Sequence, residues 1–148
     1  MAKVSGVDGD LSFDLHRLTH RLDTAADRLL DAALGLSYRR FLALLLIGEL
    51  REPTQRALAE ALGVTEPSAS RMTAVLADAG YVETTTVPGG GNRRRLQLTP
   101  SGKEAVAHSR DLLERRFADL VDRSGVPYEA YSRHTRALLA ALGDQDAE

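Results

Sequence analysis

The sequence predicts a mainly α-helical fold with a small β-hairpin wing, in which a winged helix-turn-helix lies between terminal helices. Three observations predict it. Residues 54–80 contain two short helical patterns, each opened by a threonine and closed by a glycine. Residues 81–98 contain two strand-like runs on either side of a Gly-rich turn. The rest of the chain carries long amphipathic patterns, which are typical of packed helices.

The N-terminal part begins with a polar, Gly-containing stretch, residues 1–10, which we expect to be a flexible tail. Leucines and alanines then recur at three- and four-residue steps. This spacing predicts an amphipathic helix of about six turns that ends near Gly35. Ser37 can cap a second helix from Tyr38 to about Leu50. The middle of that helix is apolar all round, so we expect it at the centre of the fold.

Two short helices follow. Thr54 can cap the first, which closes at Gly63, and Thr65 can cap the second, which ends at Gly80. In the second helix, apolar residues recur at helical spacing and are predicted to form one buried stripe: Ala69, Met72, Val75 and Leu76. The polar residues left facing outward are Ser68, Ser70, Arg71 and Thr73.

These outward side chains suit insertion into the major groove of DNA. Small hydroxyl groups and one arginine near a helix N-terminus are narrow enough to enter the groove, and they can hydrogen-bond to base edges or phosphates. The alternative is an ordinary solvated helix face, which the surrounding pattern disfavours. The candidate DNA-binding residues of the two helices are Gln55, Thr65, Ser68, Ser70, Arg71 and Thr73.

The hairpin is predicted from strands at 81–87 and 93–98, joined by the turn residues Pro-Gly-Gly-Gly-Asn at 88–92. Three arginines follow the turn: Arg93, Arg94 and Arg95. A guanidinium group makes forked contacts to phosphate oxygens, so we expect these arginines to contact the DNA backbone or minor groove. Arg93 and Arg95 are favoured, because Arg94 shares its face with Leu96 and Leu98. The alternative is a solvated hairpin edge.

Two further helices complete the chain. Thr99 and Pro100 can start the first, which stops at Ser124 and Gly125, and Pro127 can begin the second. Residues 144–148 are expected to fray. The candidate buried positions on these helices are Ala105, Leu112, Leu113, Phe117, Leu120, Val121, Tyr128, Tyr131, Leu138, Leu139 and Leu142.

The terminal helices carry more apolar surface than a reading domain of about fifty residues can cover. A two-fold homodimer solves this, because each chain covers the apolar stripe of the other. Two reading helices about 34 to 36 Å apart would then prefer a pseudo-palindromic site on double-stranded DNA. We therefore expect residues 11–148 to form a single domain. In it, 11–52 and 100–148 form a helical dimerisation region and 53–99 form the winged helix-turn-helix.

The composition agrees with a soluble DNA-binding protein. Hydrophobic residues make up 43% of the 148, and no run approaches the roughly 20 apolar residues of a membrane span. No secretory signal pattern is visible, so we expect a cytoplasmic protein that does not enter the membrane. The net charge is −2, yet residues 54–103 hold six basic against four acidic residues. Charges more than about 10 Å apart are largely screened, so this local excess can act on DNA.

His16 and His20 lie four residues apart on the first predicted helix, with Asp23 on the same face, a spacing able to hold zinc. Two imidazoles do not make a site without further ligands. We therefore predict no metal and no cofactor, and keep a metal-responsive regulator that uses His16 and His20 as an alternative. The chain has no cysteine, which excludes disulfides and thiolate zinc sites.

The segments TQRALAEALGVTEPSASRMTAVLADAGYV and RRRLQLTPSG resemble the DNA-binding domain of the MarR family, the multiple antibiotic resistance regulators. The resemblance covers the central third of the chain, and the helical flanks agree in order and length. It implies a homodimeric transcription regulator, usually a repressor released by a small ligand. The chain departs from the family pattern at 90–93, where Gly-Gly-Asn-Arg lacks the acidic residue that often precedes the key arginine of the wing.

The resemblance also implies a place for the effector, between the dimer helices and the reading head. A small acid bound there is expected to change the distance between the two reading heads. In this chain that place corresponds to the first two helices. The polar groups suited to an anionic aromatic ligand are His16, His20, Tyr38, Arg39 and Arg40.

Other function classes receive less support. Nothing in the sequence resembles a phosphate loop, a nucleophile elbow or a metalloprotease helix, so we do not expect an enzyme. A winged helix that binds another protein, without DNA contact, is the main alternative. The basic wing argues against it.

Overall fold

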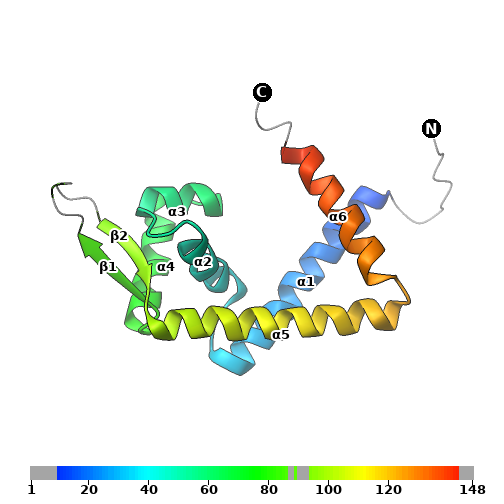
Figure 1. Cartoon of the computed structure of the whole chain (residues 1–148), viewed down its shortest axis with the longest axis horizontal. Coiled ribbons are helices and arrows are strands. Elements are labelled where there is room, and N and C mark those ends of the chain that lie inside the picture. The colour runs from blue at the N-terminus through cyan, green and yellow to red at the C-terminus, as the bar shows by residue number, and fades with distance from the viewer. Residues whose placement is uncertain (1–9, 87–88, 90–93, 144–148) are drawn as a thin grey trace. The chain divides into compact units, whose positions relative to one another are not determined.

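The computed structural model describes residues 10–86, 89 and 94–143. The helices and strands are, in order, α1 (Leu11–Leu34), α2 (Tyr38–Glu49), α3 (Gln55–Leu62), α4 (Glu66–Asp78), β1 (Val82–Thr86), β2 (Arg94–Leu98), α5 (Pro100–Ser124) and α6 (Tyr128–Gly143) (Figure 1). The chain divides into two compact units, 1–109 and 110–148, and α5 runs from the first into the second. None of the described helices is long and apolar enough to cross a bilayer.

The first two helices end and begin at the predicted residues. Gly35 follows α1 in the left-handed conformation, with a φ of 63°. The hydroxyl of Ser37 accepts a hydrogen bond from the Arg40 amide at 3.2 Å and so caps α2. From α1, the Asp27 carboxylate accepts a second bond from the Tyr38 amide at 2.7 Å. The positive end of the helix dipole also stabilises a carboxylate at the N-terminus of α2. This contact therefore ties α1 to α2.

Helix α2 is the centre of the first unit, as its apolar sequence predicts. Phe41, Ala43, Leu44 and Ile47 are buried, and the helix contacts α1, α3, α4 and β2. Burying a leucine or isoleucine side chain contributes about 1.5–3 kcal/mol. The packing around α2 therefore decides where the neighbouring helices and the hairpin lie.

Helices α3 and α4 form the helix-turn-helix, and both predicted caps are confirmed. Thr54 accepts from the Ala57 amide at 3.1 Å, and Thr65 accepts from the Ser68 amide at 3.3 Å. Gly63 ends α3 in the left-handed conformation, with a φ of 66°. This conformation is less strained for glycine than for a residue with a side chain. The turn between the two helices is therefore set by local chemistry.

The predicted buried stripe of α4 is partly wrong. Ala69 and Leu76 are buried, but Val75 is 41% exposed, whereas Thr73, expected to face outward, is only 3% exposed. The buried positions 69, 73 and 76 are spaced by four and three residues, so they form one line that faces α3 and α2. The hydroxyl of Thr73 can take a place in that line because it is hydrogen-bonded there, as described below.

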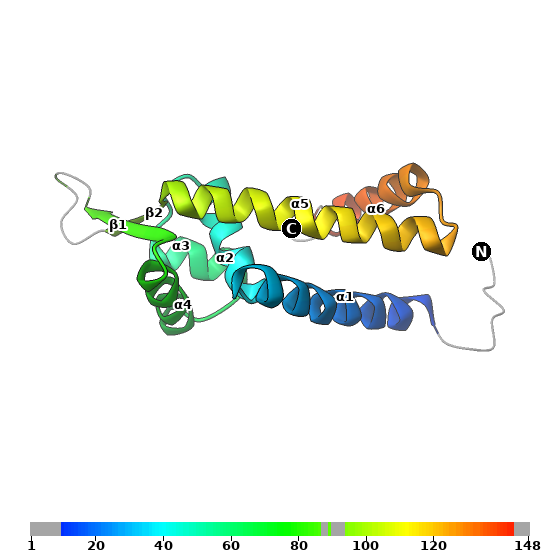
Figure 2. The same cartoon turned by 90° about the horizontal axis from the view of Figure 1, so that it is seen from below.

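Strands β1 and β2 pair antiparallel, with Val82 opposite Leu98 and Thr86 opposite Arg94. Leu96 and Leu98 are buried on one face, as predicted, and β2 contacts α2. The hairpin lies beside α4 and its far end extends away from the helices (Figure 2). Residues 88 and 90–92 of the predicted turn, with the neighbouring strand residues 87 and 93, fall outside the described residues.

The start of α5 is joined closely to the end of α4. The hydroxyl of Thr99 accepts from the Gly102 amide at 3.0 Å and donates to the Gly80 carbonyl at 2.6 Å. The Thr99 amide donates to the Tyr81 carbonyl at 3.0 Å, and β1 starts at Val82, one residue later than expected. One threonine thus links Gly80 and Tyr81, which lie between α4 and β1, to the first turn of α5.

The second unit contains the end of α5 and α6, which begin and end at the predicted residues. Phe117 packs near Tyr128 and Tyr131, with ring centroids 6.3 and 6.5 Å apart, and the Tyr128 hydroxyl is hydrogen-bonded to Glu114. The predicted burial of Tyr128, Leu138, Leu139 and Leu142 is wrong for the single chain. The three leucines are 59–63% exposed.

We predict that Gly102→Ala destabilises the protein by about 2 kcal/mol. A Cβ atom at this position would lie 2.1 Å from the Tyr81 carbonyl oxygen, so the backbone of α5 or of the strand entry must shift. Urea unfolding measures the change. Gly143→Ala is the matched control, since a Cβ there meets nothing within 4 Å. Equal stability of the two variants would contradict the close approach at Gly102.

Candidate nucleic-acid interface

The first two turns of α4 carry a connected row of polar side chains. Thr65 donates to the Ser68 hydroxyl at 3.0 Å, and the Arg71 guanidinium donates to the same oxygen at 3.3 Å. Because the Ser68 oxygen accepts both bonds, its own hydrogen is left to donate outward. Thr65 and Arg71 are exposed. The row therefore presents hydroxyl and guanidinium donors to an acceptor outside the chain.

Ser70 is exposed on α4, but Gln55 and Thr73 do not belong to this row. Gln55 Nε2 donates to the Thr73 hydroxyl at 2.6 Å, and that hydroxyl donates to the Ser70 carbonyl at 3.0 Å. Thr73 was predicted to contact DNA, and its burial corrects the outward orientation on which that prediction rested. The two side chains instead hold α3 against α4, and so position the reading helix.

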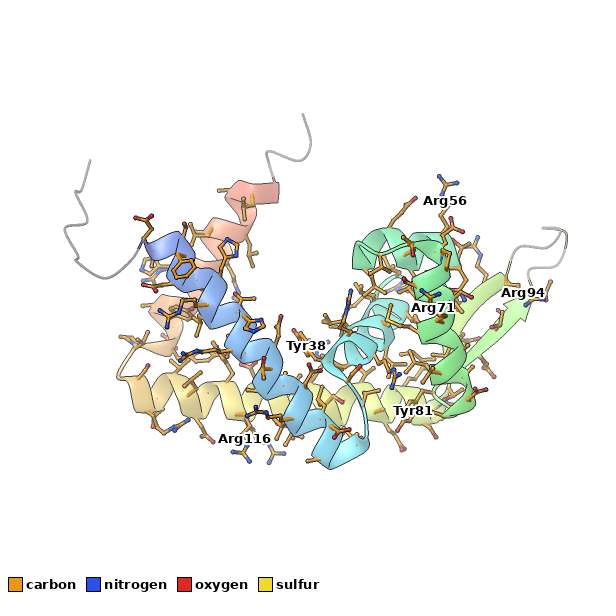
Figure 3. The ribbon with its side chains drawn as sticks, turned by 180° about the vertical axis from the view of Figure 1, so that it is seen from behind. Tyr38, Arg56, Arg71, Tyr81, Arg94 and Arg116 are labelled. Atoms are coloured by element: carbon orange, nitrogen blue, oxygen red, sulfur yellow. The ribbon has the colours of Figure 1, made fainter. Side chains whose placement is uncertain are left out.

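The wing arginines have different surroundings. Arg94 is exposed opposite Thr86, at the end of the hairpin. Arg95 is half-buried, and its Nη1 lies 3.4 Å from the Glu52 carbonyl oxygen, to which it donates. The face shared by Arg94 and Leu96 is thus buried at Leu96 and open at Arg94, so sharing this face does not bury Arg94. Arg93 lies outside the described residues. Figure 3 shows Arg56, Arg71 and Arg94 on three elements of the winged helix-turn-helix.

A strained corner anchors the hairpin, and sequence reasoning missed it. Arg51 and Glu52 both have positive φ, 51° and 57°, which is uncommon for residues other than glycine. The next carbonyl, that of Pro53, accepts a hydrogen bond from the Leu96 amide at 2.8 Å. Left-handed conformations of this kind cost about 1–2 kcal/mol per residue. The conformation of the corner directs the carbonyl groups of Glu52 and Pro53 toward β2, and the hydrogen bonds that they accept there offset its cost.

A pocket of about 320 Å³ lies between the N-terminal end of α2 and α4. The residues that line it are Ser37, Arg39, Arg40, Val64, Ser68, Arg71 and Met72. Within the described part of the chain, no carboxylate pairs with the side chains of Arg39, Arg40 or Arg71. Three arginines that pair with no carboxylate of the described residues thus line one concave surface, and their positive charge favours an anion there.

Of the five residues predicted for the effector site, only Arg39 and Arg40 line this pocket. Tyr38 instead packs near Phe41, with ring centroids 6.0 Å apart. Burial and then the charge of Asp23 raise the pKa of Tyr38, so its phenol stays neutral near pH 7. His16 and His20 are exposed on α1. Among residues 10–86, 89 and 94–143, no three potential ligands gather to hold a metal ion. The structure therefore gives the metal-responsive alternative no support.

Comparison with known proteins shows what this chain is similar to. Residues 34–95 match the MarR family. No curated protein matches the sequence at a significant level. The resemblance predicted from the helix-turn-helix and wing segments is thereby confirmed. The MarR family consists of transcription regulators and not of enzymes.

The fold is similar to several solved structures. Wild-type MarR of E. coli, in its apo form, superposes with a TM-score of 0.77 at 18% identity, over 91% of this chain and 98% of that one. The Mycobacterium tuberculosis MarR family protein RV2887, in complex with salicylic acid, gives 0.71 at 21% identity, over 91% and 98%. A mutant of S. aureus MepR bound to an oligodeoxyribonucleotide gives 0.63 at 20%, over 93% and 99%. These likenesses confirm the mainly α-helical winged-helix fold.

We predict that Thr73→Val lowers the free energy of unfolding by about 1–3 kcal/mol, since it leaves the buried Gln55 amide without its acceptor. Valine has nearly the same shape as threonine, so packing changes little. Ser70→Ala, which removes an exposed hydroxyl, should change stability by less than about 0.5 kcal/mol. Chemical denaturation of both variants tests the assignment, and an unaltered stability of Thr73→Val would show that the tie between α3 and α4 contributes nothing.

Proposed function

We propose that this chain, which resembles the MarR family of transcription regulators in residues 34–95 and in fold, is a dimeric DNA-binding repressor that a small anionic ligand releases from its operator. The observation that carries the proposal is the exposed polar row on α4, whose arginine has no carboxylate partner among the described residues. We also propose that the protein acts in the cytoplasm, as the sequence predicts.

The DNA contact is assigned to two elements. Helix α4 enters the major groove with Thr65, Ser68, Ser70 and Arg71, because these side chains form or adjoin its exposed polar row. Arg94 reaches the neighbouring backbone from the hairpin, and Arg93 and Arg95 add positive charge to the same wing. The solved complex of a MepR mutant with an oligodeoxyribonucleotide supports DNA binding by this fold.

The dimer is assigned to the terminal helices. Leu138, Leu139 and Leu142 are exposed on α6, as are Leu11 and Phe13 on α1. Leucine and phenylalanine exposed in such number are costly in water and typical of an interface. A second copy of the chain would cover them through a two-fold axis, and the paired reading helices would select a pseudo-palindromic operator.

The ligand is assigned by charge. Arg39 and Arg40 lie at a concave surface without a carboxylate partner in the described chain, so an organic acid is the complementary ligand. The complex of RV2887 with salicylic acid supports such an effector for a protein of this fold.

We predict that Arg71→Ala weakens binding to a selected DNA fragment by about 1–3 kcal/mol. We also predict that Arg94→Ala makes the plot of log association constant against log salt concentration less steep, by about one unit of slope. Fluorescence anisotropy at several salt concentrations measures both, with fragments that the protein selects from a random pool. The control is Arg116→Ala, which removes an exposed arginine of α5 outside the proposed interface. Unchanged affinity and slope in both test variants would refute this mode of DNA binding.

We also predict that Leu139→Glu converts the protein from a dimer into a monomer at micromolar concentration. The side chain is 63% exposed in the single chain, so the change should leave the fold of the monomer intact. Sedimentation velocity reports the mass, against 16.1 kDa for one chain. Leu50→Glu, at an exposed leucine beyond α2, is the matched control and should stay dimeric. A dimeric Leu139→Glu protein would exclude this helix from the interface.

A further inference from the structure

We propose that Val75 of α4 determines part of the operator specificity, because it contacts the C5-methyl group of one thymine in the major groove. The inference rests on the proposed function and deepens it. The polar row of α4 is already assigned to DNA, and Val75 adds an apolar contact that selects one base. Helical spacing in the sequence predicted this residue in the core, so it was not among the candidate DNA contacts.

Val75 is exposed because Thr73 occupies the buried side of α4. Thr73 is 3% exposed, and its hydroxyl accepts a hydrogen bond from Gln55 Nε2 at 2.6 Å. Successive residues of an α-helix are about 100° apart, so residues 73 and 75 point about 160° away from each other. A rotation of α4 that buried the valine would break the contact with Gln55 and leave its buried amide without an acceptor. The hydrogen bond therefore keeps Val75 on the outer side of the helix.

Val75 also continues the line of the polar row. Residues 68, 71 and 75 are spaced by three and four, so Arg71 and Val75 lie within about 40° of each other around the helix axis. Ser68 and Arg71 are already joined by a hydrogen bond of 3.3 Å. Val75 does not line the pocket between α2 and α4, so its role is separate from that of the pocket.

The chemistry of this side chain suits thymine. A single exposed valine is ordinary on a protein surface, so its place beside Arg71 is what gives it meaning. Among the four bases, thymine alone presents a methyl group in the major groove, and an apolar side chain in contact with that group distinguishes it from cytosine. Valine strongly prefers one rotamer in a helix, so its two methyl groups are held in place. Val75 thus supplies a contact that hydroxyl and guanidinium groups cannot.

The length of the line limits where the thymine lies. Four residues of helix separate Arg71 from Val75, or about 6 Å, which is roughly two base-pair steps of about 3.4 Å. We therefore expect the thymine within about two steps of the group that Arg71 contacts. Asp78 is exposed one turn beyond Val75, and DNA phosphates would repel its carboxylate. The contact face therefore ends at Val75.

The experiment removes the methyl group from the DNA and its partner from the protein. The full-length protein first selects a duplex from a random pool, and each thymine of the site is then replaced in turn by deoxyuridine, which lacks the methyl group and keeps the pairing edge. Fluorescence anisotropy measures each dissociation constant. We expect one replacement to weaken binding by about fourfold, as for the loss of one buried methyl group. With Val75→Ala, the same replacement should change binding by less than about twofold, since the contact is already lost.

Two control variants separate this contact from other effects. Val126→Ala truncates a valine of nearly equal exposure, 42% against 41%, so it should keep the fourfold effect. Val126 lies between α5 and α6, outside the winged helix-turn-helix. Arg71→Ala should weaken binding to both duplexes and keep their ratio. Because each ratio compares two duplexes with one protein, an effect of the substitution on folding cancels.

Other outcomes overturn the assignment. Selected sites in which no thymine is favoured, or binding that no deoxyuridine weakens, would exclude a methyl contact. A methyl effect that survives Val75→Ala would assign the contact to another side chain. In these cases DNA binding itself persists, so the proposed function stands without this contact. If the unmodified protein bound no duplex at all, the proposed function would fail, and the role of Val75 would fail with it.

Discussion

Burial of α2 is the constraint on which the rest of the first unit depends. Leu44 and Ile47 are almost completely excluded from solvent, and the same helix touches α3, α4 and β2. A short helix such as α3, with eight residues, is marginal by itself in water. Its position, and that of the reading helix beside it, therefore comes from the apolar surface that α2 offers.

Polar contacts then fix the positions of the helices more closely than the packing of the core does. Gln55 and Thr73 join α3 to α4, and Thr99 joins the end of α4 to the start of α5. The close approach at Gly102 leaves little room for these elements to slide. A helix tied to α3 at Thr73 and to α5 just beyond its C-terminal end can hold its side chains in one arrangement, which would reduce the entropy lost when it binds a ligand.

The charge of the molecule is organised locally. The formal net charge is −2, yet Arg39, Arg40 and Arg71 gather at one pocket and Arg94 extends from the wing. The hydrogen bond from Arg95 to the Glu52 carbonyl shows that a basic residue of the wing can stabilise the fold and is not necessarily reserved for binding a ligand.

The sequence alone determined the order of the elements and their caps, since Ser37, Thr54, Thr65 and Thr99 bond to backbone amides within three residues of themselves. Only the tertiary structure decided which face of α4 is buried, that Arg94 is exposed while Arg95 is half-buried, and that Arg40 and Arg71 line one pocket. Those outcomes depend on neighbours distant in the chain, and helical spacing carries no information about which neighbour covers a face. The exposed leucines of α6 have the same cause: their periodicity shows an apolar stripe, but not whether the covering surface belongs to the same chain.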